Sequence, residues 1–270
     1  MTMLRKDTPS LPDSSFNPIY AYGKQDKSGH LHVSAEPSSQ KSVSYSGATD
    51  EELRNVYNDI PKFYDRANAL ISFFQDVKWR VELIKATVRY AEKFNIVLDV
   101  ASGKGELSLL IKRILPVQLV MMDYAENMLY QAMVDGDRIL ASFYNMPFRG
   151  DAFDAVMSSF ALHVADEIEE VIKEMVRVSK DVIGVIAMGK SDNSLFRAYV
   201  GFYLAHIQPW LASLVGAKVQ DYRYIYYIYR RIPTNSQVRR MFERNLELKE
   251  FRVKTLGSVY IAVGKKRKGR

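Results

Sequence analysis

Residues 96–106 read Ile96-Val97-Leu98-Asp99-Val100-Ala101-Ser102-Gly103-Lys104-Gly105-Glu106. The apolar run at the start predicts a buried strand of a parallel sheet, because both faces of such a strand meet apolar neighbours. In the turn that follows, glycines let the backbone approach a ligand, since they have no Cβ. Apolar residues then recur with helical spacing from Leu107 to Ile114. Strand, turn and helix together predict the first half of a nucleotide-binding βαβ unit.

A second apolar run, Leu119 to Met122, ends in Asp123, where a carboxylate can accept both hydroxyls of a ribose. The turn is not a dinucleotide fingerprint, because Ser108 replaces its third glycine, and it is not a P-loop, because Leu98 replaces the first. Asp99, beneath the turn, would repel a pyrophosphate but suits an ammonium group. S-adenosylmethionine (SAM) has an adenosine, no phosphate and an amino-acid end. The sequence therefore favours SAM over an ordinary βα turn.

Composition limits the class of protein. A chain of 270 residues with 47% hydrophobic residues can bury one substantial core. The absence of cysteine excludes disulfides and thiolate metal sites, and it favours an intracellular protein. The four histidines lack ligand spacing, so no metal is expected. The first residues show no apolar signal-peptide core.

The chain divides into a tail and one domain. Residues 1–48 are rich in Ser, Pro, Gly and Lys, which predicts a disordered or tail extension. Residues 49–264 form the predicted domain, in which 189–232 are an inserted substrate lid. Residues 265–270 are a basic tail, expected to be solvated. This tail holds part of the net charge of +7, so the sequence gives no strong nucleic-acid signal.

The strand-turn-helix resembles motif I of the class I SAM-dependent methyltransferases, and the match extends from about Asn55 to Lys266. It is most similar to the family that C-methylates ubiquinone and menaquinone precursors. Residues 222–225 resemble the Tyr-Arg-Tyr-Leu segment of that family, and residues 257–266 resemble its C-terminal motif. The resemblance implies an α/β fold, a doubly wound, Rossmann-like, seven-stranded sheet with one antiparallel edge strand. It also implies SAM as cofactor.

The same resemblance assigns site residues. Tyr64 and Arg80 are implied polar contacts in a cover over the methionine end of SAM. Ser142 and Phe143 stand at the adenine-contacting pair. The full set of expected cofactor-binding residues is Asp99, Ala101, Ser102, Gly103, Lys104, Gly105, Asp123, Tyr124, Met128, Ser142, Phe143 and Ser159.

His163 follows the strand 153–159, whose end lies at the ligand-binding edge of an open α/β sheet. Quinone methyltransferases usually show Arg-Asn where this chain has His163-Val164, whereas the commoner class I pattern has a histidine. We expect His163 and Tyr64 to be catalytic, with His163 as a base. A structural histidine and proton transfer to a bound water are the alternatives.

The inserted segment should select the substrate. Ala198 to Val219 is apolar, but polar residues and a proline interrupt it, which predicts two short helices rather than a membrane span. Tyrosines then crowd residues 222–229 and could serve packing, RNA stacking or an aromatic-substrate pocket. The apolar lid beside them favours the pocket, with Arg80, Tyr222 and Tyr224 as substrate contacts.

The predicted function is SAM-dependent C-methylation of a small, aromatic, quinone-like lipophilic acceptor. The alternatives are O- or N-methylation of another small molecule, RNA methylation, or a non-catalytic protein with the same fold. We expect a cytoplasmic protein, and the sequence leaves open a peripheral membrane contact and a homodimer.

Overall fold

The computed structural model describes residues 24–25, 31–32, 75–132, 134–213 and 219–268. Tyr64 lies outside these residues, as does the beginning of the predicted 49–264 domain. Within the 1–48 extension the structure describes only β1 (Lys24–Gln25) and β2 (Leu31–His32), which pair antiparallel.

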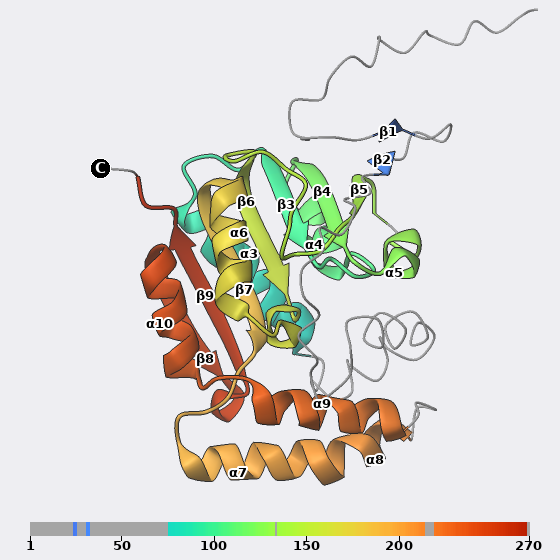
Figure 1. The fold of residues 1–270 in the computed structure, drawn as a ribbon, viewed down its shortest axis with the longest axis vertical. Helices are drawn as coiled ribbons and strands as arrows, with labels where there is room; N and C mark the ends of the chain where they lie inside the picture. The colour runs from blue at the N-terminus through green and yellow to red at the C-terminus, as the bar shows by residue number, and fades with distance from the viewer. Residues whose placement is uncertain (1–23, 26–30, 33–74, 133, 214–218, 269–270) are drawn as a thin grey trace, which may run out of the picture.

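A seven-stranded sheet carries the fold, in the order β5-β4-β3-β6-β7-β9-β8 (Figure 1). Its strands are β3 (Ile96–Val100), β4 (Gln118–Asp123), β5 (Asp137–Leu140), β6 (Phe153–Ser159), β7 (Ser179–Met188), β8 (Glu247–Lys254) and β9 (Val259–Lys265). Only β9 runs antiparallel to its neighbours, and it lies one strand inside the edge strand β8. The predicted doubly wound, seven-stranded sheet with one antiparallel strand at its edge is confirmed, with the antiparallel strand placed next to the outermost strand.

Helices cover both faces of the sheet. They are α3 (Asp76–Tyr90), α4 (Glu106–Ile114), α5 (Glu126–Tyr130), α6 (Ile168–Val178) and α10 (Asn235–Asn245). Helices α6 and α10 share one apolar cluster with the sheet, and α3 and α4 share the other. The central strand β3 contributes to both, with Leu98 and Val100 on one side and Val97 on the other. This alternation is the two-residue period of a strand buried on both faces.

A separate helical layer follows β7. It consists of α7 (Ser194–Phe202), the π-helix η2 (Tyr203–Ile207), α8 (Gln208–Ser213) and α9 (Val219–Arg231). Val200 and Leu204 pack against Tyr229, in the last turns of α9, and against Ile232, the residue that follows α9. Helices α7 and α8 lie outside α9 (Figure 1). The sequence predicted two short helices here, but α7, η2 and α8 follow one another without a break. No helix in the described part of the chain is long and apolar enough to cross a membrane.

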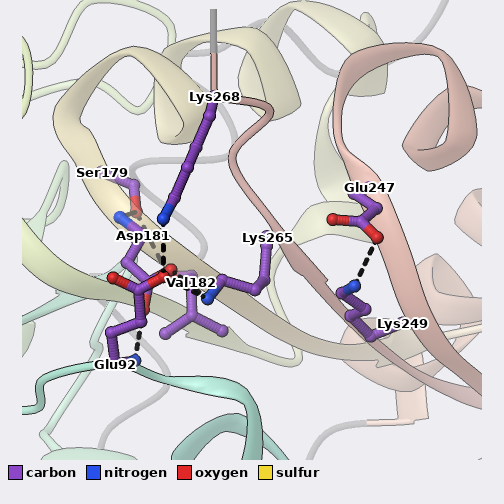
Figure 2. Close-up of polar contacts among 8 residues, drawn as sticks. All are labelled: Glu92, Ser179, Asp181, Val182, Glu247, Lys249, Lys265 and Lys268. Atoms are coloured by element: carbon purple, nitrogen blue, oxygen red, sulfur yellow. Dashed lines mark hydrogen bonds and ion pairs between the residues drawn. The ribbon is translucent and has the colours of Figure 1, made fainter.

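Three lysines of the expected basic tail, Lys265, Lys266 and Lys268, make ion pairs in the structure. The Lys265 ammonium lies 3.0 Å from carboxylate oxygens of both Asp181 and Glu92 (Figure 2). The second Asp181 oxygen accepts the backbone N–H of Glu92 at 2.6 Å. Lys266 pairs with Asp151 at 2.5 Å. The Lys265–Asp181 pair joins the end of β9 to the start of β7, which begins at Ser179.

Candidate active site

The turn after β3 has a strained backbone held by strand β4. Ala101, Gly103 and Gly105 have φ of 53°, 57° and 82°, in the left-handed region that favours glycine. The Ser102 N–H donates to the Met122 carbonyl at 3.0 Å, which fixes the turn against the neighbouring strand. Ala101 adopts this conformation despite its Cβ, and strain of this kind is common at functional sites.

The two glycines of the turn face different surroundings. Among the described residues, a Cβ on Gly103 would meet one atom within 4 Å, the Glu106 Oε2 at 3.8 Å, so these residues leave this side of the turn open. A Cβ on Gly105 would lie 3.0 Å from Val134 Cγ1 and 3.3 Å from Met121 Sδ. Gly103 can therefore admit a ligand close to the backbone, whereas the side of Gly105 that would carry a Cβ packs against the protein.

Asp99 is fully buried beneath the turn, as the sequence predicted. The Ser108 hydroxyl donates to its Oδ2 at 2.7 Å, while its Oδ1 has no hydrogen-bond partner among the described residues. Burial raises the pKa of Asp99 to about 7, and the nearby carboxylates of Glu106 and Asp123 act in the same direction. The site thus holds more acidic groups than it can easily keep charged, which favours a cationic ligand.

Asp123 ties strand β4 to the glycine turn. Its Oδ2 accepts the Gly103 N–H at 2.7 Å, and its Oδ1 accepts the Ala125 N–H at 2.8 Å. Burial raises the pKa of Asp123, whereas these backbone donors oppose the rise. The backbone N–H of Tyr124 acts on the same carboxylate and also lowers its pKa. A carboxylate has about four acceptor positions, so a ribose would share Asp123 with three backbone donors. Sequence analysis predicted the ribose role but not this bracing of the turn.

Arg80 of α3 meets the end of strand β6. Its Nε donates to Ser159 Oγ at 3.4 Å, and its Nη1 pairs with Asp76 at 2.7 Å. Its guanidinium lies over the Phe160 ring, 5.1 Å from the centroid, a geometry in which a cation is attracted to the ring face. Arg80 also acts on Asp99 electrostatically and favours its charged form. Phe160 has φ of 54°, a strained conformation that no sequence signal predicted.

His163 lies in the 3-10 helix η1 (Leu162–Val164), beyond the end of β6. Its Nδ1 is buried and has no hydrogen-bond partner among the described residues. Burial lowers the pKa of His163 to about 4, so the imidazole is neutral near pH 7. Helix α9 contacts η1, which brings the inserted helical layer next to this histidine.

The remaining expected cofactor residues lie along the ends of β4 and β5. The Ser142 hydroxyl accepts the Tyr144 N–H at 3.3 Å, and the Phe143 ring packs against the Tyr144 ring. Met128 is buried in α5, whereas Tyr124 is exposed. The Tyr144 hydroxyl accepts backbone N–H groups of Asp166 and Glu167, which anchors this loop to the start of α6. Tyr144 was absent from the predicted site.

Comparison with known proteins identifies the family. The model of the ubiE/COQ5 methyltransferase family matches residues 45–266. The chain belongs to this family. It is a SAM-dependent methyltransferase, as the sequence predicted.

Relatives within the ubiE/COQ5 family match along most of the chain. A demethylmenaquinone methyltransferase from Geobacillus sp. (strain WCH70) is 28% identical over 234 residues, covering 81% of this chain and 98% of the relative. A protein of the same name from Thermotoga maritima is 28% identical over 187 residues, covering 66% and 80%.

Solved structures confirm the fold of this methyltransferase. A SAM-dependent methyltransferase from Thermotoga maritima superposes with a TM-score of 0.55 at 15% identity, covering 79% of this chain and 99% of that one. A Pyrococcus horikoshii OT3 protein superposes with a TM-score of 0.53 at 17% identity, covering 82% and 100%.

The residues of the methyltransferase turn fit its cofactor. SAM carries a sulfonium and an ammonium, and the turn combines an open glycine with the buried, partly unsatisfied Asp99 carboxyl. The Ser102 hydroxyl is also buried without a partner among the described residues. Within the described residues, no group of three or more His, Cys, Asp or Glu could hold a metal ion.

Three residues predicted to belong to the site are not described in full by the structure. Tyr64 lies outside the described residues. Tyr222 and Tyr224 lie on α9, but their side chains are likewise outside the described part. Their assigned roles stay predictions.

Proposed function

We propose that this methyltransferase methylates a ring carbon of a small, quinone-like aromatic acceptor. The proposal rests chiefly on the match with demethylmenaquinone methyltransferases, which extends over 98% of the Geobacillus relative. The neutral His163 between the end of β6 and helix α9 supports it, because a phenolic acceptor needs a partner for its hydroxyl.

SAM supplies a methyl group already activated by the sulfonium, so the protein chiefly has to align the acceptor and exclude water. We assign the ribose hydroxyls to Asp123 and the amino-acid end to the open face of Gly103, above Asp99. Arg80 belongs to the same end of the site, where it pairs with Asp76 and hydrogen-bonds Ser159. The adenine would lie near Ser142 and Phe143.

His163 acts in this scheme as a hydrogen-bond acceptor first and a base second. A phenol has a pKa near 10, and a histidine of pKa about 4 cannot remove that proton in advance. As the new carbon–carbon bond forms, positive charge develops on the ring and the hydroxyl becomes strongly acidic. The Nδ1 of His163 then accepts the hydroxyl proton, which leaves a neutral dienone. Water takes the ring C–H proton, the proton on His163 returns to the ring oxygen, and the aromatic hydroxyl is restored.

The direct test offers the purified protein SAM with a demethylated naphthoquinol and a demethylated benzoquinol. We expect a product heavier by one methylene unit, with fragmentation in the mass spectrometer placing the methyl on a ring carbon. Methylation on oxygen, or turnover only with an unrelated amine or with RNA, would contradict the proposed acceptor.

The role of His163 has its own variant. His163→Ala should lower kcat by about 100-fold, the usual size of an acid–base contribution, while the SAM affinity measured by calorimetry changes little. His206→Ala is the matched control, since His206 is an exposed histidine whose ring lies tilted against Phe202 at the outer side of the inserted helices. Undiminished turnover in His163→Ala would assign His163 a structural role.

A further inference from the structure

The helical run α7–η2–α8 exposes a row of large apolar side chains. Leu195, Tyr199, Phe202 and Trp210 are 73%, 57%, 57% and 61% exposed, and Phe196 and Ile207 are 40% and 36% exposed. We call these six residues the aromatic face. Most exposed apolar residues of a protein are scattered singly, so a continuous row of this kind indicates a binding surface.

The row stays on one side because of the π-helix in its middle. Exposed residues recur at 195, 199, 202, 207 and 210, and buried ones at 200, 204 and 208. In an α-helix, a step of four residues turns the face by about 40°, so such rows would drift around the helix. The wider turn of η2 (Tyr203–Ile207) reduces this drift. The exposed side chains therefore stay on one side of the helical run from α7 to α8.

Charge favours an anionic partner. Residues 194–213 contain no Asp or Glu. At the α7 end, Tyr229 of α9 donates a hydrogen bond to the Arg197 carbonyl, and the Lys190 ammonium donates to the Arg230 carbonyl. Lys190, Arg197 and Arg230 thus gather there. Burial lowers the pKa of Lys190, and the charges of Arg197 and Arg230 lower it further.

One acidic residue, Asp192, lies next to this basic group. Asp192 Oδ1 accepts the Ser236 hydroxyl at 2.7 Å and the Ser236 backbone N–H at 3.2 Å. Burial tends to raise the pKa of Asp192, but the Ser236 and Thr234 hydroxyls, the Ser236 N–H and the charge of Arg197 together lower it, so Asp192 is charged and partly offsets Arg197. The three cations Lys190, Arg197 and Arg230 outnumber this one carboxylate, so positive charge is in excess at the α7 end of the aromatic face.

We propose that the aromatic face docks on the surface of an anionic lipid bilayer. Trp, Tyr and Phe side chains suit the boundary between headgroups and acyl chains, and basic residues beside them suit anionic headgroups. Helices α7 and α8, which carry the face, lie at the outside of the molecule beyond α9 (Figure 1), so a flat surface can reach them without rearrangement. The inference goes beyond the proposed acceptor, since it concerns a different surface from the one around His163.

The test is flotation of the full-length protein with vesicles of phosphatidylcholine alone or mixed with phosphatidylglycerol. The wild type should float with the mixed vesicles, less at high salt, and Trp210 emission should shift to the blue. Trp79, the second tryptophan, is 8% exposed and gives a constant background. Tyr199→Ser/Phe202→Ser should lower the vesicle partition coefficient at least ten-fold, with an unchanged melting temperature and unchanged SAM affinity.

Tyr130→Ser/Val253→Ser is the matched control. Tyr130 and Val253 are 84% and 48% exposed but lie on α5 and β8, so this variant should bind vesicles like the wild type. The proposal fails if the wild type does not float, or if the Tyr199/Phe202 variant floats equally well. It also fails if light scattering shows a wild-type dimer that this variant converts to a monomer, with no vesicle binding by either. SAM affinity and methylation of a soluble acceptor are measured separately, so these outcomes leave the proposed reaction untouched.

Discussion

The buried carboxyl of Asp99 should make both the stability of the unliganded protein and its affinity for SAM depend on pH. Its pKa is raised to about 7, so the folded protein binds a proton that the unfolded chain releases near pH 4. The free energy of unfolding therefore decreases as pH rises from about 4 to about 7. A bound cation would favour the charged carboxylate and reverse this effect.

Asp99→Asn should stabilise the unliganded protein at pH 8 by on the order of 3 kcal/mol, because it removes the buried charge and can still accept from Ser108. The wild type should bind SAM about ten-fold more weakly at pH 6 than at pH 8, and the variant should show no such dependence. Denaturation and calorimetry at both pH values measure the two effects. Ser108→Ala, which keeps the carboxyl and removes its donor, should raise the Asp99 pKa further. An identical pH profile in wild type and Asp99→Asn would disprove the linkage.

At the scale of elements, the glycine turn combines an open position with a packed one. Gly105→Ala should cost about 2–4 kcal/mol of stability, from left-handed strain together with the contact with Val134. Gly103→Ala should cost only about 1–2 kcal/mol, the strain alone, which Ala101 already tolerates.

Ligand binding should rank the two variants in the opposite order. Gly103→Ala places a methyl on the open side of the turn and should weaken SAM binding more than Gly105→Ala does in its folded fraction. Chemical denaturation and calorimetry on both proteins check the pair. Equal effects of the two substitutions on both quantities would mean that the two glycines do not differ in role.

At the scale of the whole molecule, the C-terminus closes the sheet through ion pairs (Figure 2). The Lys265 side chain is 18% exposed and contacts two carboxylates, whereas Lys268 is 83% exposed and contacts only Glu92, also at 3.0 Å. A partly buried charged contact stabilises far more than an exposed one.

Lys265→Ala should therefore lower the free energy of unfolding by about 1–2 kcal/mol, while Lys268→Ala should leave it unchanged. Urea denaturation of both variants measures the difference. Equal stability of the two would show that the terminal basic run is a solvated tail after all.

The sequence by itself determined the elements around the cofactor. The apolar run before Ala101 and the glycines after it specify strand, turn and helix through local geometry alone. Parallel strands end at the same edge of a sheet. The strand pattern in the sequence therefore also places Asp123, Ser142 and Ser159 at that edge. Those placements need only residue periodicity and the direction of the strands.

Only the tertiary structure decided which side chains meet. Arg80 reaches Ser159 and Phe160 across 79 residues of sequence because α3 packs on the sheet beside β6. The same packing leaves Gly103 open and closes Gly105. Lys265 pairs with Asp181 because β9 lies antiparallel to β7. A local pattern fixes how a segment folds, but contacts between distant segments depend on how the layers pack, and no single segment encodes that.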